Sequence, residues 1–229
     1  MKLLLTFVLV AGVAAAAETE FVQVAGTVSI ARKSRSKTAT NAGAVIWLKP
    51  VGSKTTVQAR RFEMRQEHKH FDPHLLVVPA GSVVAFPNRD PFLHNVFSLF
   101  DGKRFDLGLY ESGASHNVTF DRPGLCYIFC NIHPEMSAVI VVLDTPYFAV
   151  SGASGEFAMD NVPAGRYQLH VWHERAKPEA PAAFPREITV SPGAAVIATI
   201  RLVDAGQLIV PHKNKYGKDY DIPAGGIYR

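Results

Sequence analysis

Four side chains of types that bind soft transition metals stand out in the sequence. Cys130, His133 and Met136 fall within seven residues, in the segment Cys-Asn-Ile-His-Pro-Glu-Met, and His94 lies upstream of them. Two imidazoles, one thiolate and one weak thioether are the ligand set of blue-copper electron-transfer sites. Zinc also accepts cysteine and histidine, but a structural zinc site favours more cysteines and has no use for a methionine. The residue types therefore predict a copper site.

The sequence around these residues indicates how they are positioned. The apolar run 125–129 is typical of a strand that ends just before the cysteine, and 138–143 is typical of the next strand. The loop between the two strands can offer three ligands, and Pro134 stiffens it because its ring fixes one backbone dihedral. His94 directly precedes another predicted strand, 95–100, so a neighbouring loop can close the site.

Short β-rich runs bounded by turn residues recur along the chain, and no apolar stretch after the first seventeen residues has the period of an amphipathic helix. The 17 glycines and 15 prolines supply many turns without reaching the content of a collagen or a linker. We therefore predict an all-β protein built from sandwiches or barrels. The predicted strands are 21–30, 44–48, 75–78, 82–86, 95–100, 116–120, 125–129, 138–143, 155–159, 167–173, 187–190 and 195–202.

Residues 56–143 resemble the cupredoxins of the plastocyanin and amicyanin group. The spacing between His133 and Met136 is similar to that of the short ligand loop of amicyanins. The motifs that carry the resemblance are Phe-x-Pro at 71–73, Val-x-x-Gly at 78–81, Asn-x-Asp at 88–90, His-Asn-Val at 94–96, a Pro-Gly turn at 123–124 and Cys-x-x-His-Pro-x-Met at 130–136.

This resemblance implies a Greek-key β-sandwich that holds one type 1 copper per chain. It implies that electrons enter or leave through the exposed edge of a histidine ligand, His133. It also implies that Asn95 and Asn88 support the ligands through hydrogen bonds. The implied equatorial ligands are His94, Cys130 and His133, and the implied axial ligand is Met136.

The later part of the chain resembles a second family, the carboxypeptidase-regulatory-like sandwiches of the transthyretin type. A Gly-x-Phe strand at 155–157 is followed by Pro-x-Gly-x-Tyr at 163–167, as in that family. The opening strands of such a sandwich are found far upstream, at 26–28 and 44–48. We therefore predict a sandwich made of 22–50 and 145–203, with the cupredoxin domain inserted into it or docked beside it, and an irregular tail at 204–229.

The first seventeen residues are typical of a secretory signal peptide. Lys2 supplies the positive start, residues 3–13 form an apolar run, and Ala15 and Ala17 fit the cleavage pattern before Glu18. The run is too short to span a membrane, and no later stretch approaches the roughly 18 apolar residues that a span needs. The sequence therefore predicts a periplasmic or secreted chain, 18–229, with no membrane span.

The two cysteines enter an oxidising compartment, where a disulfide is the simplest expectation. However, Cys126 and Cys130 belong to one predicted strand, where four residues span about 13 Å. A disulfide needs Cα atoms within about 7 Å. We therefore expect no bridge between them, and we interpret Cys126 as a small buried apolar residue.

The charge and the motifs exclude several classes of function. The net charge is +4, and the basic residues gather in one short cluster at 32–37 without interleaved aromatic residues, so nucleic-acid binding is not expected. The chain has no phosphate-binding glycine loop, no His-Glu-x-x-His motif and no nucleophile elbow. A nucleophilic pair of Cys130 and a nearby histidine is conceivable, but Met136 and the order of the loop favour a metal. We therefore expect a protein that is not an enzyme.

The prediction from sequence is a periplasmic blue-copper protein that carries single electrons, with a c-type cytochrome or a quinoprotein dehydrogenase as partner by analogy. One alternative is a copper storage or delivery protein that loads copper at 68–74, which holds three histidines. His68 and His70 would share a face of a strand, although solvated or hydrogen-bonded histidines are the simpler interpretation. Another alternative is an envelope interaction protein without redox function. The apolar residues near His94, among them Phe92 and Leu93, are either core or an exposed docking patch.

Overall fold

The structure is a computed structural model that describes residues 20–31, 40–99, 102–179, 184–193, 195–205 and 213–220. Every regular element in these residues is a β-strand, so the all-β prediction is confirmed. A search of the same residues finds no helix with the length and apolar character of a membrane span. The predicted signal peptide, 1–17, and the basic cluster, 32–37, lie outside the described residues.

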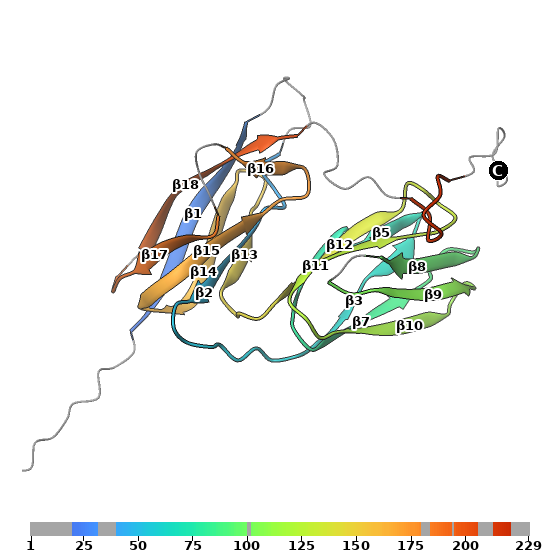
Figure 1. Ribbon diagram of the computed structural model, residues 1–229, viewed down its shortest axis with the longest axis horizontal. Coiled ribbons are helices and arrows are strands. Elements are labelled where there is room, and N and C mark those ends of the chain that lie inside the picture. Colours follow the sequence, from blue (N-terminus) through green and yellow to red (C-terminus); the bar gives the residue numbers. More distant parts are fainter. Residues whose placement is uncertain are drawn as a thin grey trace, which may run out of the picture.

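The strands form two groups that lie side by side (Figure 1). One group comes from both ends of the chain: β1 (Phe21–Ala31), β2 (Val45–Pro50), β13 (Phe148–Val150), β14 (Glu156–Pro163), β15 (Gly165–Trp172), β16 (Ala176–Pro178), β17 (Arg186–Val190) and β18 (Ala195–Asp204). The other comes from the middle: β3 (Arg61–Glu63), β4 (Arg65–Glu67), β5 (His70–Asp72), β6 (Leu75–Pro79), β7 (Ser82–Pro87), β8 (His94–Ser98), β9 (Phe105–Tyr110), β10 (Ser115–Phe120), β11 (Gly124–Phe129) and β12 (Ser137–Leu143).

The first group forms two four-stranded sheets, ordered β14-β1-β18-β16 and β13-β2-β15-β17. Strand β1 pairs antiparallel with β14 and parallel with β18, so the beginning of the described chain lies between two late strands. Alternate residues of both sheets point inward, as the two-residue period of a strand requires. Together they bury one cluster, the terminal core, which includes Val24, Val28, Ile46, Leu48, Phe157, Leu169, Ile200 and Leu202.

The second group forms a three-stranded sheet, β10-β7-β3, a five-stranded sheet, β6-β12-β11-β8-β9, and the β4-β5 hairpin. Strand β11 pairs antiparallel with β12 along its whole length, and Phe129 of β11 faces Phe97 of β8. The end of β11 is therefore next to both the start of β12 and the strand that begins at His94. These strands bury a second cluster, the central core, which includes Met64, Phe71, Phe86, Val96, Phe120, Cys126, Ile128 and Ile140.

Strand β12 is buried on both faces, because each face meets a different apolar cluster. Ala138, Ile140 and Val142 belong to the central core, and the alternate residues Val139 and Val141 belong to a third cluster. This third cluster, the junction cluster, joins the outer face of the five-stranded sheet to the outer face of the β13-β2-β15-β17 sheet. Its members include Val45, Trp47, Leu75, Val77, Leu125, Tyr127, Phe148 and Trp172.

Polar contacts reinforce the junction between the two groups. The Lys49 ammonium lies 2.8 Å from the Asp144 carboxylate, and Thr55 Oγ1 donates to the Asp144 carbonyl over 2.7 Å. The His74 imidazole contacts the Glu174 carboxylate through Nε2 at 2.6 Å and the Ser137 carbonyl through Nδ1 at 2.9 Å. The hydrogen bond to Glu174 raises the pKa of His74 above its usual value, against the opposing effect of burial.

This ion pair predicts a pH-dependent contribution to stability. Because the pKa of His74 is raised on folding, the contribution is present below the unfolded pKa of about 6.5 and is lost as pH rises through the folded value. The imidazole is half exposed, so the contribution stays below about 1 kcal/mol. We expect His74→Gln to lower the free energy of unfolding, measured with urea, at about pH 6 and to have less effect at about pH 9. The matched variant is His70→Gln, which alters an exposed strand histidine. A His74→Gln effect that is equal at both pH values, or that His70→Gln reproduces, contradicts the prediction.

The structure differs from the predicted strands where the elements are short. Strands β3, β4, β5, β13 and β16 have three residues each, too few to show a period, and β9 was also missed. If the segment around His68 were a strand, His68 and His70 would share a face. It is a hairpin turn instead, because His68 and Lys69 adopt left-handed conformations with φ of 55° and 58°. His173 was also placed on a strand, but β15 ends at Trp172.

Candidate metal centre

The loop between β11 and β12 carries three of the four predicted ligands. Cys130 directly follows β11, and Met136 directly precedes β12. The Cys130 amide donates to the Met136 carbonyl over 3.2 Å, and the Met136 amide donates to the His133 carbonyl over 3.0 Å. These two hydrogen bonds close the loop on itself. The pairing of the two strands therefore brings the three residues close together.

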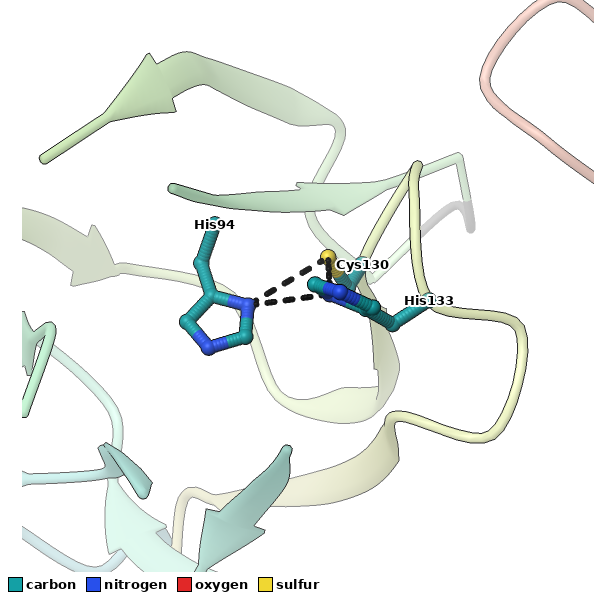
Figure 2. Close-up of side chains that lie close together, drawn as sticks. All are labelled: His94, Cys130 and His133. Atoms are coloured by element: carbon teal, nitrogen blue, oxygen red, sulfur yellow. Dashed lines mark hydrogen bonds between the residues drawn. The ribbon is translucent and has the colours of Figure 1, made fainter. Parts of the chain in front are cut away.

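Three donor atoms converge at the end of these strands (Figure 2). Cys130 Sγ lies 3.9 Å from His94 Nδ1 and 3.6 Å from His133 Nδ1, and the two Nδ1 atoms are 3.2 Å apart. Three donors at these separations lie roughly 2 Å from their common centre, which is close to metal–nitrogen and metal–sulfur bond lengths of about 2.0–2.3 Å. The residues therefore fit a single transition-metal ion.

The fourth predicted ligand, Met136, is the last residue of the loop between β11 and β12. Its side chain is fully buried in the central core together with Cys130. Among the residues that the structure describes, His94, Cys130 and His133 form the one cluster of three histidine, cysteine or acidic side chains able to share a metal ion. Both cysteines are free and buried.

Burial sets the protonation of the donors. It raises the pKa of the Cys130 thiol, although backbone amide hydrogen bonds from Asn95, Ile132 and His133 oppose the shift. It lowers the pKa of His133, and the neighbouring His94 lowers it further. The site therefore favours a neutral His133 imidazole that can donate a lone pair, and a cation between the donors would offset the cost of the buried thiolate.

The orientation of His94 is set by Asp90, which is not one of the site residues predicted from sequence. His94 Nε2 lies 2.8 Å from the Asp90 carboxylate, and both side chains are buried. A carboxylate partner fixes the proton on Nε2 and leaves the Nδ1 lone pair directed at Cys130. The signal available in the sequence was an acidic residue four positions before His94, in the Asn-x-Asp motif.

Asp90 is itself held by the unusual turn at the tip of the β4-β5 hairpin. The amides of His68 and Lys69 donate to its two carboxylate oxygens over 2.7 and 2.9 Å, and the Asp90 amide donates to Asn88 Oδ1 over 3.0 Å. Burial by itself would raise the pKa of Asp90, but the hydrogen bonds from Lys69, His94 and His68 outweigh it and lower that pKa below its usual value. Asp90 is therefore a carboxylate at neutral pH.

The two asparagines expected near the site are both buried and hydrogen-bonded. Asn95 Oδ1 accepts from the Asn131 amide over 3.3 Å, next to Cys130, and Asn95 Nδ2 donates to Asp106 over 2.7 Å. Asn88 supports the turn that leads to His94, because its Nδ2 donates to the Phe92 carbonyl over 2.8 Å. Each asparagine thus links one part of the ligand set to a neighbouring strand or turn.

Apolar side chains lie next to the histidine ligands. Leu93 and Ile132 are 47% and 42% exposed, and the half-buried Phe92 ring lies 5.2 Å from the His94 ring and 5.8 Å from the His133 ring. His133 is 9% exposed, so only a small part of this residue reaches the surface. Phe97 is fully buried, so the residues near His94 divide between core and surface.

The other described histidines do not form a second centre of three ligands. His74 is held by Glu174 and Ser137, and His68 and His70 lie on a turn and on an exposed strand. His170 stacks on Trp47 at 4.9 Å, and His116 packs edge-on against Tyr110. His212 lies outside the described residues.

No protein-family model matches the chain, and no curated protein matches its sequence. Among solved structures, it is similar to a reduced mutant of amicyanin, at 20% identity over 43% of this chain and 98% of that one, with a TM-score of 0.35. It is similar to a purple cupredoxin from Nitrosopumilus maritimus, at 22% identity over 38% of this chain and 100% of that one, with a TM-score of 0.31. It is also similar to a copper-containing nitrite reductase from Thermus scotoductus SA-01, at 25% identity over 43% of this chain and only 25% of that one, with a TM-score of 0.36.

Proposed function

We propose that this chain is a blue-copper protein of the cupredoxin type that carries single electrons between redox partners. The observation that carries the proposal is the convergence of His94 Nδ1, Cys130 Sγ and His133 Nδ1 within 3.9 Å of one another in a buried site. Copper bound there supplies one-electron transfer by alternating between two oxidation states. One copper per chain matches the one ligand cluster among the described residues.

The chain's own residues hold the donors in place. His94, Cys130 and His133 bind the ion, and Met136 is its weak fourth ligand. Because the loop is closed by backbone hydrogen bonds and His94 is fixed by Asp90, little in the protein has to move when an electron arrives. A rigid site keeps the cost of reorganisation low, and this favours electron transfer over metal release.

We also propose how the chain is organised around this site. Residues 56–143 form the cupredoxin domain, inserted into a transthyretin-like sandwich of 22–50 and 145–203, with 204–229 as the tail. The shared terminal core of early and late strands supports this division. The signal peptide at 1–17 directs the chain to the periplasm, and the second sandwich serves stability or docking.

The partner in this proposal is a redox protein, a c-type cytochrome or a quinoprotein dehydrogenase. It docks on the apolar surface formed by Phe92, Leu93 and Ile132, close to His133. The chain is not an enzyme in this proposal. Cys130 is fully buried and points at two imidazoles, which suits a metal ligand better than a nucleophile that must reach a substrate.

Copper storage or delivery is the main alternative, and it expects a loading site among His68, His70 and His74. The structure lends it no support, because no described metal-binding cluster of three ligands includes these residues. A non-redox interaction protein is the other alternative, and it is tested through Cys130 below.

The proposal is tested by titrating the exported chain, 18–229, with Cu(II) and recording visible and EPR spectra. We expect intense absorption in the red, a narrow copper hyperfine splitting and saturation at one copper per chain. Weak, featureless absorption with several coppers bound would contradict electron transfer and favour copper handling.

A further inference from the structure

A short segment near the end of the chain, Lys213–Tyr220, lies beside the metal-binding loop. In Figure 1 it is the red segment at the end of the central strands, far from the strands that precede it in sequence. The segment is folded on itself: Asn214 Oδ1 accepts from the amides of Tyr216 and Lys218 over 3.0 Å, and Gly217 closes the turn with a φ of 73°. It is therefore a compact unit docked on the loop.

Three hydrogen bonds join this segment to the site. The Tyr220 hydroxyl donates to the Cys130 carbonyl over 3.0 Å, and the Lys215 amide donates to Asn131 Oδ1 over 2.9 Å. The Lys215 ammonium lies 2.7 Å from the Asp106 carboxylate, which also accepts from Asn95. The contacts span 84 to 109 residues of sequence, so they are made only by the folded chain.

These contacts act on one peptide bond, the one that joins Cys130 to Asn131. Its carbonyl accepts from Tyr220, and its amide donates to Asn95. The Asn131 side chain accepts from Lys215, and Lys215 and Asn95 share Asp106, so the hydrogen bonds close a ring around this peptide.

We propose that Lys213–Tyr220 is a positioning segment for the metal site, in which Tyr220 and Lys215 fix the Cys130–Asn131 peptide. This peptide is the first link of the loop that leads from Cys130 to His133. Its rotation changes the separation of Cys130 Sγ and His133 Nδ1, which is 3.6 Å. The effect on bound copper rests on the proposed function, whereas the fixing of the peptide does not.

The test uses two variants and two matched controls from the same segment. Tyr220→Phe removes the hydroxyl that binds Cys130, and Lys215→Met removes the ammonium that binds Asp106. Tyr216→Phe alters a tyrosine that is 71% exposed and keeps the ring, whose centroid lies 5.4 Å from the Lys215 ammonium. Lys218→Met alters an exposed lysine. Tyr220→Phe loses the hydrogen bond to the Cys130 carbonyl, and Lys215→Met loses the contact with Asp106. Each loss loosens the Cys130–Asn131 peptide, so in the metal-free chain we expect the Asn131 amide to exchange with solvent about three- to tenfold faster in both test variants. The two controls should match the wild type.

In the copper-loaded chain the readouts are the reduction potential and the EPR hyperfine splitting. Both should shift in Tyr220→Phe and stay unchanged in Tyr216→Phe. Unchanged amide exchange in both test variants would overturn the proposal whether or not copper binds. Faster exchange with an unchanged potential and EPR spectrum would overturn it too, since the segment would then only stabilise the fold. A wild-type chain that gives no red absorption contradicts the proposed function, and amide exchange then still decides whether the segment holds the loop.

Discussion

Cys130→Ser removes the intense red absorption of the copper-loaded chain. Cys130 Sγ is the one sulfur among the three converging donors, and the blue colour of such sites depends on a thiolate bound to copper. A serine hydroxyl in this fully buried position does not ionise at neutral pH and is a poor ligand for a soft metal. We expect the affinity for copper to fall by at least about a hundredfold, since even residues that only support metal ligands account for 10- to 100-fold. Visible spectroscopy and competition with a copper chelator measure both effects.

The chain contains its own control in Cys126. This cysteine is also fully buried, in the central core, but its thiol donates to the Lys103 carbonyl and lies 3.3 Å from Ser98 Oγ. Cys126→Ser keeps a small hydrogen-bond donor there and should leave the colour and the copper stoichiometry unchanged. If both variants keep the colour, Cys130 is not a ligand. If both variants lose the colour, the effect is one of folding. If Cys130→Ser binds a partner as the wild type does, and the wild type transfers no electrons to it, the non-redox interaction protein becomes the better explanation.

The loop ligands could be found from the sequence because their geometry is local. Cys130, His133 and Met136 lie in the loop between two strands that are paired as far as Phe129 and Ser137. Residues that are close in the sequence of this loop are therefore also close in space. His94 was found for a similar reason, since it begins a strand that the apolar pattern had located. The long strands of both groups were also predictable, because each alternates apolar and polar or buries both faces against a neighbouring cluster.

The contacts that hold the ligands were not predictable, because they join residues without a shared pattern. Asp90 lies in a turn, and its partners are two amides of another turn that adopts left-handed conformations without glycine. Tyr220 reaches Cys130 across 90 residues, from a tail expected to be irregular. The junction cluster explains why β12 is apolar throughout, but a fully buried strand does not reveal in its sequence which partner covers each face.

Asp90→Asn weakens copper binding although Asp90 contacts no metal. The carboxylate accepts three hydrogen bonds, from His94 and from the amides of His68 and Lys69. An asparagine has the same shape but one carbonyl oxygen, so its NH2 group must face either an amide hydrogen or the His94 ring. In either orientation the His94 Nε2–H loses the ionised acceptor that fixes its proton. We expect about 10- to 100-fold weaker copper binding, and a loss of about 1–3 kcal/mol in the free energy of unfolding from a buried donor left without an acceptor.

A surface carboxylate separates this effect from a general loss of negative charge. Asp121, which pairs with Lys103 on the surface, should tolerate Asp121→Asn without a change in copper affinity. The decisive comparison is between affinity and stability, measured by chelator competition and by urea unfolding of the metal-free chain. If Asp90→Asn lowers stability but binds copper like the wild type, Asp90 supports only the turn. If affinity falls and the EPR hyperfine splitting changes, its role is to orient His94, because a loss of stability alone leaves the spectrum of the folded, copper-loaded chain unchanged.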